Sequence, residues 1–456
     1  TIMSSHIQDL STVYAFDTLE ITASWDESVK LDLKTLVSDL DLFEHIDKPW
    51  ITGLLALEDT SDILAGVGLG GNDRVEVKIR RNEAPDKEVF IHKFFRVDKV
   101  VEKINRGLNE NSSVVLLHLI EEVWYESNAI NVNKSYEGKP KDIMTAITES
   151  FLTNRVVLGP ATDVQDMKVI VPNMTPLDAI TWIKNRATTN EGFPLFVYSS
   201  LPVFGDGKDA LWVFDLEYML KQKPWNEDSP FNNFASSQLG RGVPQRRTIL
   251  AYEQKKTEDI SSLMNMGLIE GRHQFIDVTT MDVKKVEYNH ETEINELLES
   301  RGMKGRSVVP SYYSVHGNKL NEMSSAKDNE VGNRLITNIG GTNAYEDALT
   351  IDERDKKSHY KHRPLSNAFK SLLAYDRLVA VVDGWDFTLN GHNTIGRVMS
   401  FLFMSTQSNP EDTRERFDKQ KTGNYLIYAA KHSFKSEGYD VTLTAVKLTH
   451  GEYNDS

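Results

Sequence analysis

Cysteine is absent from this chain of 456 residues. The absence excludes a disulfide framework, thiol chemistry and zinc sites built on cysteine. It leaves the compartment open, because a chain without cysteine suits an oxidising or a reducing environment. The hydrophobic content of 39% is ample for a large core, and the length argues for more than one domain.

Long apolar runs and an excess of basic residues are also missing. No run approaches the roughly 20 apolar residues of a membrane span, so we expect no membrane association. The opening stretch TIMSSHIQDL has no apolar core, and we expect no signal peptide. The formal net charge of −15 argues against binding of nucleic acid by a basic face. An acidic surface is nevertheless compatible with a channel through which DNA passes without adhering.

Residues 1–125 show the alternation of apolar and polar residues that β-strands require. The alternating stretches and apolar runs lie at 19–25, 29–33, 54–57, 75–79, 90–97 and 114–122. Many short strands over this length are typical of a β-barrel or a sandwich. The continuous apolar run Val114–Leu117 predicts a central strand that is buried on both faces.

A capped helix is predicted after Met174. Thr175 can cap it, Pro176 suits the first helical position, and Asp178 falls three residues after the cap. The apolar residues that follow form one stripe at helical spacing: Leu177, Ile180, Ile183 and Ala187.

The residues around this helix predict an α+β domain at 126–225. Two short apolar runs flank the turn Gly205–Asp209 and predict a hairpin. Leu216–Lys223 predicts a short second helix that stops before a proline. Upstream, apolar residues at four-residue spacing follow Pro140 and predict a further helix.

The second half of the chain is polar at first and then β-rich. Residues 226–364 predict an extended linker, some strands and a long irregular polar segment at 317–364. Residues 365–378 predict a helix. The strands predicted after it lie at 379–382, 387–389, 395–403, 425–429 and 439–448. The expected fold is therefore mainly β with α+β parts. Its domains are 1–125, 126–225, 226–364 and 365–456, and they need not be continuous in sequence.

Gly66–Gly71 matches the pattern G-x-G-x-x-G of dinucleotide sites. Such a site needs a strand before the glycines and a helix after them. Here the strand-like stretch NDRVEVKIRR follows. We therefore interpret these glycines as a flexible connection between strands.

Two motifs together suggest a serine acyl enzyme, in which lysine activates serine. Ser324–Lys327 matches S-x-x-K and Lys421–Gly423 matches K-T-G, but the third element of the set, S-x-N, is absent between them. The alternative is a solvated loop and a turn before a strand, and the polar surroundings of Ser324 favour it.

His359 and His362 are spaced to share a metal on a helix. They lie in the charged stretch DERDKKSHYKHRP, which offers no clear third ligand. A solvated charge run is the simpler interpretation.

Two pairs of carboxylates also suggest catalysis. Asp39 and Asp41 alternate along a predicted strand and would face the same side, as the paired carboxylates of a hydrolase do. Solvated edge residues are the alternative. Asp383 and Asp386 flank Trp385 at the start of a predicted strand, where a turn role is favoured.

The last candidates are His432 and Trp182, which are better explained as a packed or hydrogen-bonded strand histidine and as a core or interface side chain. No nucleophile, base and orienting group occur together in these motifs. We therefore predict no catalytic, cofactor-binding or metal site, and an assembly protein without a cofactor in preference to an enzyme.

Three patterns in 166–225 resemble a known family. They are P-x-M-T-P-L-D-A-I-x-W-I-x-x-R-A, then G-x-P-x-F-x-Y-x-S-L, then L-K-Q-x-P-W. They resemble the central baseplate hub of contractile-tailed phages, the T4-like adapter between tail tube and central spike, which is related to the type VI secretion spike. Further matching stretches are Phe16–Ile21, Pro49–Gly53, Asn133–Lys139 and Thr422–Ile427 with His432, Phe434, Tyr439 and Val441.

The resemblance implies a structural protein of the virion. Each chain would contribute two tail-tube-like β-barrel domains to a homotrimeric ring, so that six barrels match the sixfold tube above a threefold spike. The implied partners are the tail tube protein, the central spike protein and other baseplate subunits, with DNA passing through the lumen without specific binding. Assembly in the host cytoplasm and residence in the tail baseplate follow from the same resemblance.

Two alternatives stay open at this point. One is the hub of a phage-like contractile injection particle, which uses the same adapter geometry. The other is a phage-associated hydrolase with an unrecognised site, although no lysozyme-like or peptidase-like domain is visible. The segment 317–364 matches no hub pattern, and it would suit an insertion that contacts another baseplate subunit.

Overall fold

The structure is a computed structural model that describes most of the chain from Tyr14 to His450. The described residues are 14–59, 68, 70–81, 89–105, 113–160, 166–202, 208–233, 247–256, 260–266, 270–277, 281–289, 293–294, 297–298, 306–307, 314–315, 318–319, 335–339, 362–388, 394–405, 417–418, 420–447 and 449–450.

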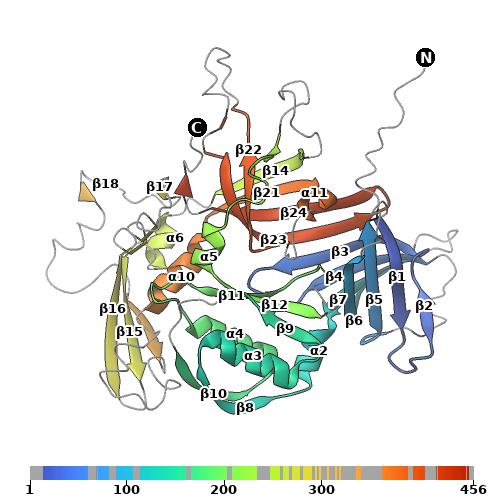
Figure 1. The fold of residues 1–456 in the computed structure, drawn as a ribbon, viewed down its shortest axis with the longest axis horizontal. Helices are drawn as coiled ribbons and strands as arrows, with labels where there is room; N and C mark the ends of the chain where they lie inside the picture. The colour runs from blue at the N-terminus through green and yellow to red at the C-terminus, as the bar shows by residue number, and fades with distance from the viewer. Residues whose placement is uncertain are drawn as a thin grey trace.

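One sheet of 13 strands dominates the molecule (Figure 1). Its strand order is β14-β21-β24-β23-β3-β4-β7-β6-β5-β1-β2, and β22 and β13 join it beside β23. The N-terminal strands are β1 (Tyr14–Thr22), β2 (Lys30–Asp32), β3 (Val37–His45), β4 (Thr52–Asp59), β5 (Arg74–Arg81), β6 (Val89–Asn105) and β7 (Ser113–Glu121). The later strands are β13 (Phe231–Asn232), β14 (Ile249–Lys256), β21 (Asp376–Asp383), β22 (Val398–Leu402), β23 (Gly423–Lys435) and β24 (Gly438–Val446).

Alternation of side chains explains why these stretches form strands. On β5, Val75, Val77 and Ile79 point into the core and the residues between them are half-buried. β7 alternates in the same way from Ser113 to Leu119, so the prediction that Val114–Leu117 is buried on both faces was wrong. An antiparallel sheet needs cover on one face only, and the other face keeps partial contact with solvent.

Two predicted elements near the C-terminus differ from the structure. Helix α10 (Arg363–Leu372) ends before the predicted position 378, because β21 already begins at Asp376. The predicted strand at 387–389 is instead the short helix α11 (Gly384–Thr388). The Asp383 carboxylate accepts a hydrogen bond from the Asp386 backbone N–H (2.9 Å) and so caps this helix. A local cap therefore overrides the strand-like composition.

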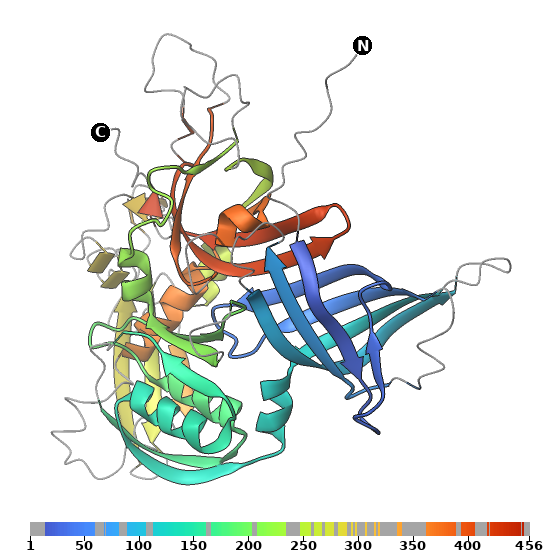
Figure 2. The same ribbon diagram turned by 45° about the vertical axis from the view of Figure 1, so that its right-hand side comes forward.

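The region between the two β-rich parts is an α+β unit with its own apolar core. Its elements are α2 (Glu122–Asn128), β8 (Val132–Gly138), α3 (Pro140–Phe151), β9 (Arg155–Leu158), β10 (Met167–Met174), α4 (Pro176–Arg186), β11 (Leu195–Ser199), β12 (Asp209–Asp215) and α5 (Leu216–Lys221). Figure 2 shows α3 and α4 side by side, with β8 and β10 beneath them.

The cap, the apolar stripe and the strand pair predicted for this unit are confirmed. The Thr175 hydroxyl accepts a hydrogen bond from the backbone N–H of Asp178 (3.3 Å), and the predicted stripe of α4 is buried. β11 and β12 form the predicted antiparallel hairpin, whose turn residues 203–207 lie outside the described part. The Asp215 side chain caps α5.

A smaller sheet is formed by β16 (Asp282–Asn289), β15 (Glu270–Asp277) and β20 (Leu335–Ile339), and α6 (Ile260–Asn265) precedes it in the chain. β20 lies inside the segment predicted as irregular, and it pairs in parallel with β15. Its apolar residues explain this departure. Two minor pairs are β17 (Arg306–Ser307) with β25 (Thr449–His450) and β18 (Ser314–Val315) with β19 (Asn318–Lys319). Most of 317–364 lies outside the described residues.

The fold is thus mainly β with some helices, as the sequence predicts. Strand pairing among the described residues forms one open path that ends at β14 and β2, and it does not close into a barrel. No helix in the described part of the chain is both long and apolar enough to cross a membrane.

Candidate functional site

The two β-rich ends of the chain meet where β3 pairs with β23 (Figure 1). The pairing is antiparallel and runs from Ala429 opposite His45 to Lys435 opposite Asp39. We call this pair of strands the seam. Backbone hydrogen bonds across the seam join the N-terminal and C-terminal strands into one sheet.

A buried polar cluster lies under the seam, and we call it the Glu44 cluster. Glu44 Oε2 lies 2.8 Å from His432 Nε2, although the two residues are 388 positions apart. The other ring nitrogen of His432 lies 2.7 Å from the Tyr439 hydroxyl. Glu44 also accepts hydrogen bonds from the backbone N–H of Leu201 (2.7 Å) and from the Thr394 hydroxyl. Strands and loops from three regions therefore converge on one carboxylate.

The hydrogen bonds assign a role to each group. As a carboxylate Glu44 can only accept, so His432 Nε2 donates to it. In the tautomer that carries its proton on Nε2, Nδ1 accepts from the Tyr439 hydroxyl. Burial, together with the charge of Glu44, raises the pKa of Tyr439 well above its ordinary value, which keeps the phenol protonated and able to donate. His432 is 0% exposed, so this chain of hydrogen bonds orders the core and has no open side for a substrate.

Arg397 is a buried cation beside the Glu44 cluster. Its guanidinium donates a hydrogen bond to the backbone carbonyl of Phe387. The same guanidinium lies 5.2 Å from the centre of the Phe387 ring and 4.9 Å from the centre of the Trp225 ring. Burial lowers the pKa of Arg397 to about 10, and the negative charge of Glu44 opposes that shift. Aromatic faces and one carboxylate thus take the place of water around the guanidinium.

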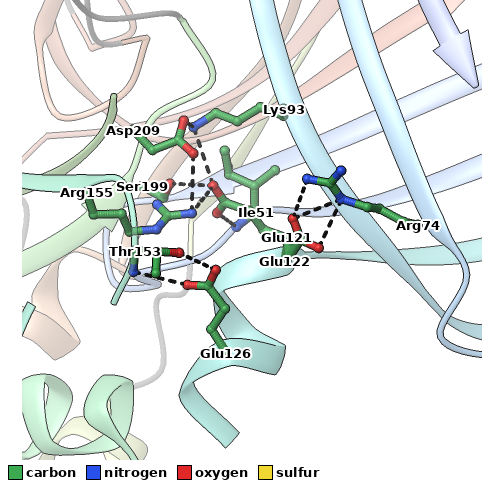
Figure 3. A network of polar contacts seen from close by, with 10 residues as sticks. All are labelled: Ile51, Arg74, Lys93, Glu121, Glu122, Glu126, Thr153, Arg155, Ser199 and Asp209. Atoms are coloured by element: carbon green, nitrogen blue, oxygen red, sulfur yellow. Dashed lines mark hydrogen bonds and ion pairs between the residues drawn. The ribbon is translucent and has the colours of Figure 1, made fainter. Parts of the chain in front are cut away.

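A second polar cluster joins the large sheet to the α+β unit (Figure 3). Lys93 Nζ lies 2.5 Å from Asp209 Oδ1 and 3.4 Å from Glu121 Oε1. Arg155 Nη2 lies 2.9 Å from Glu121 and 3.5 Å from Asp209. We call these four residues the Glu121 cluster. They come from β6, β7, β9 and β12, so two cations and two anions connect both units.

Glu121 is fully satisfied at this junction. Besides its two cations it accepts hydrogen bonds from the Ile51 backbone N–H (2.9 Å) and the Ser199 hydroxyl (3.2 Å), both drawn in Figure 3. Burial acts to raise the pKa of Glu121, but the charges of Arg155 and Lys93 and these hydrogen bonds lower it to about 2. The carboxylate is therefore charged at any ordinary pH.

A surface ion pair network adjoins the Glu121 cluster. Glu122 begins α2, and its carboxylate lies 3.0 Å from Arg74 Nη2 and 2.7 Å from Arg96 Nη2. The guanidinium of Arg74 also lies 4.0 Å from the centre of the Phe94 ring. This network fixes the start of α2 against β5 and β6.

The sequence does signal these buried charges, although our sequence analysis missed them. Glu44 occurs in phase with Leu40 and Leu42 on β3, at a position where alternation demands an apolar residue. Lys93 interrupts the apolar phase of β6 and Glu121 that of β7 in the same way. A charge in the apolar phase of a strand therefore identifies a buried polar contact.

The structure describes several of the predicted candidates. Asp39 and Asp41 do lie on the same side of β3, but Asp41 forms an ion pair with Lys431 (2.9 Å) and accepts a hydrogen bond from Ser433 (2.7 Å). Their arrangement is that of charged strand residues beside the seam. The prediction that His432 is a hydrogen-bonded strand histidine is confirmed.

The K-T-G motif forms the turn that begins β23, as the alternative interpretation held. The Thr422 hydroxyl accepts from the Phe403 N–H (3.0 Å), and Lys421 pairs with Asp418 (3.1 Å). Ser324–Lys327 lies outside the described residues.

The remaining candidates also have ordinary surroundings where they are described. Asp383 caps α11, and Trp182 stacks under the guanidinium of Arg186 at 3.8 Å. Of Gly66–Gly71 only 68, 70 and 71 are described, and β5 follows them. His359 lies outside the described part. Among the residues that are described, no three His, Asp or Glu side chains form a metal-binding group.

A groove of about 650 Å³ opens at one end of the seam. Its lining comes from the start of β1, the turn before β3 and the turn between β23 and β24, and includes Tyr14, Leu36 and Glu58. The Tyr14 hydroxyl donates to the Lys435 carbonyl (3.1 Å). Burial and the charge of Asp39 raise the pKa of Tyr14 to about 12. The groove thus marks the end of the contact between the two β-rich parts.

No model of a known protein family matches the chain, and no curated protein sequence matches it. Solved structures do align with it over nearly its whole length. A tail protein from Neisseria meningitidis aligns with a TM-score of 0.48 and 11% identity, covering 95% of this chain and 96% of its own. The 43 kDa tail protein of prophage MuSo2 from Shewanella oneidensis aligns with a TM-score of 0.48 and 9% identity, covering 94% and 98%.

A component of the type VI secretion system of E. coli, the c3393 protein, also aligns. Its TM-score is 0.41 at 7% identity, and the alignment covers 97% of this chain and 77% of that one. That protein is itself described as structurally similar to T4 bacteriophage tail proteins. By their names, these neighbours are two tail proteins, one of them from a prophage, and a type VI secretion component.

Proposed function

We propose that this protein is the central hub of a contractile tail baseplate, a structural protein that forms a homotrimeric ring between the tail tube and the central spike. The observation that carries the proposal is the seam. Through it the β-rich ends of the chain, which the resemblance assigns to two tube-like barrels, become parts of one sheet. Two tube-like units held rigidly side by side are what a threefold ring needs to match a sixfold tube.

The buried clusters support the proposal because they make the chain a rigid adapter. The Glu44 cluster fixes one tube-like unit against the other, and the Glu121 cluster fixes the α+β unit against the first. A subunit that transmits force between tube and spike must keep its units in a fixed orientation relative to one another. In this proposal 1–125 and 365–456 form the barrels, and 126–225 packs outside or below the ring.

The remaining elements of the proposal concern the partners. The tail tube protein would contact one side of the ring, and the central spike protein and other baseplate subunits the other, within the virion after assembly in the host cytoplasm. DNA would pass through the lumen without specific binding, since the net charge is −15. The open face of β5 carries three cations and one anion, namely Arg74, Lys78 and Arg80 with Glu76.

Light scattering on the purified chain tests the proposal. The chain has a mass of 51.7 kDa, and a trimer has three times that mass. We expect the trimer, either alone or when a cognate spike protein is added as a template. A chain that stays monomeric in both conditions, with the spike shown to be folded, contradicts the ring.

A further inference from the structure

The loop that follows α5 is fixed along β22 by specific hydrogen bonds. The backbone N–H of Trp225 donates to the carbonyl of Val398 (3.3 Å). The side-chain amide of Asn226 binds both backbone groups of Ser400, since it donates to the carbonyl (2.9 Å) and accepts from the N–H (2.7 Å). The indole of Trp225 is therefore held in a defined place beside Arg397, the residue that precedes β22.

Two arginines lie against the Trp225 ring. The guanidinium of Arg397 lies 4.9 Å from the centre of this ring, and that of Arg247 lies 5.2 Å from it. Arg247 donates to the backbone carbonyl of Ser229 (2.6 Å), which is an uncharged acceptor. Glu44 is the carboxylate whose charge acts on Arg397. Of these three charges, two positive and one negative, one positive charge is left uncompensated.

Three hydrogen-bond donors at this place have no acceptor. Nε of Arg397, Nε1 of Trp225 and Oγ of Ser229 are buried, and none of them makes a hydrogen bond within the part of the chain that the structure describes. Arg397 as a whole is only 6% exposed. A guanidinium keeps its protons in a protein, and a buried donor without an acceptor is unfavourable. The donors therefore suit an acceptor that these residues do not supply themselves.

We propose that a small monovalent anion, such as chloride, binds between Arg397, Arg247 and Trp225. A halide ion accepts hydrogen bonds from guanidinium, indole and hydroxyl groups alike. Its single negative charge balances the one positive charge that is left over. A phosphate would bring additional negative charge close to Glu44 and to the exposed acidic pair 227–228, so it suits the site less well.

The bound anion has a structural role in this proposal. The Trp225 loop ends the α+β unit, whereas Arg397 leads into a strand of the C-terminal β-rich part, next to the Glu44 cluster. An ion that is held by both regions strengthens their contact. Because it binds the folded chain and not the unfolded one, it also makes the stability depend on the anion concentration. The site does not depend on the proposed ring, since all its residues belong to one chain.

Urea denaturation in sodium chloride and in sodium gluconate tests the site. Gluconate is also monovalent but is too large to be enclosed by these side chains, so the two salts can be compared at equal ionic strength. We expect chloride to stabilise the chain relative to gluconate. At a chloride concentration about ten times the dissociation constant, the equilibrium constant for unfolding should be lower by about tenfold. Urea is required because guanidinium chloride would itself supply the anion.

Substitutions assign the chloride effect to the site. Trp225→Phe keeps an aromatic ring but removes the indole N–H, and we expect it to weaken chloride binding by about tenfold or more. Arg397→Met removes the buried cation and should abolish the difference between the two salts. The matched control is Trp25→Phe, in the turn between β1 and β2, where the tryptophan is 63% exposed. This variant should keep the full chloride effect.

Bromide locates the ion directly, because it scatters anomalously and replaces chloride. Crystals grown in bromide should show an anomalous peak in contact with Arg397 and Trp225, and crystals of Trp225→Phe should show a weaker one. Equal stability in chloride and gluconate overturns the inference, and so does a chloride effect that Trp225→Phe leaves unchanged. Bromide peaks at the protein surface alone overturn it as well. None of these results bears on the trimer, which light scattering tests separately.

Discussion

The two buried clusters solve the same problem with different chemistry. The Glu44 cluster joins the N-terminal and C-terminal strands by hydrogen bonds among a carboxylate, an imidazole and a phenol, with the buried cation Arg397 beside them. The Glu121 cluster joins the sheet to the α+β unit by direct contact between two cations and two carboxylates.

This difference in chemistry determines how strongly each junction should be weakened when one of its groups is removed. A buried ion left without its partner is strongly unfavourable, since desolvation is no longer offset. A buried neutral donor or acceptor left unpaired costs less. The Glu121 cluster should therefore be the more sensitive of the two to loss of a single group, and also the more sensitive to pH.

The largest effect is expected for Glu121→Gln. The substitution keeps the shape of the side chain but leaves Lys93 and Arg155 with Asp209 as their remaining carboxylate. We expect the free energy of unfolding to fall by about 3–5 kcal/mol, measured by urea denaturation. The control is Glu137→Gln on the surface pair with Lys168, where the glutamate side chain is 72% exposed. Equal effects of both substitutions would contradict the comparison.

The free energy of unfolding should depend on pH through the same carboxylate, that of Glu121. The pKa of Glu121 falls from an ordinary value of 4.5 to about 2 in the folded chain. Its contribution is therefore complete above the unfolded-state pKa and is lost as pH falls from 4.5 toward 2, with a total on the order of 3 kcal/mol. The difference between the free energies of unfolding at about pH 5 and at about pH 3 measures this loss. Glu121→Gln should flatten this slope, and an unchanged slope in that variant would assign it to other groups.

Local chemistry made much of the fold predictable. The cap at Thr175, the stripe of α4 and the alternation of β5 depend on neighbouring residues, and each was confirmed. The helix α11 was missed because its cap, Asp383, sits in a stretch with the composition of a strand.

The junctions could not be predicted in the same way. The contact of Glu44 with His432 joins positions 388 apart, and no local pattern gives that pairing. The sequence does indicate that Glu44, Lys93 and Glu121 are buried, since each stands at a strand position where the alternation calls for an apolar residue. What it lacks is the identity of the partner, which depends on how the two β-rich parts are placed in space.

A smaller effect is expected at the seam from His432→Phe. The ring volume is kept, but Glu44 loses one of its hydrogen bonds and the Tyr439 hydroxyl loses its acceptor. We expect a loss of about 1–3 kcal/mol in the free energy of unfolding. His92→Phe serves as control, because His92 pairs with Glu76 on the exposed face and its side chain is 37% exposed. A loss at His432 larger than that of Glu121→Gln would reverse the order of the two clusters.

The smallest effect concerns Lys370, a cation whose described hydrogen bond goes to the neutral amide of Asn185 (3.1 Å). Burial lowers the pKa of Lys370 to about 8, with Asp47 opposing the shift and Lys184 adding to it. Because this pKa is depressed, the charged amine destabilises the fold at neutral pH, and the penalty fades as pH rises from about 8 toward 10.5.

Lys370→Met should therefore raise the free energy of unfolding at pH 7 by about 1 kcal/mol once the lost hydrogen bond is subtracted. The gain should shrink as pH rises, because the wild-type amine then loses its proton. Lys184→Met provides the contrast, since Lys184 lies 2.5 Å from Asp47 and its removal leaves that carboxylate without its cation. Stabilisation by the first substitution and destabilisation by the second would show that direct contact with an opposite charge, and not burial alone, decides whether a cation supports this fold. Destabilisation by both would show that Lys370 belongs with the paired cations.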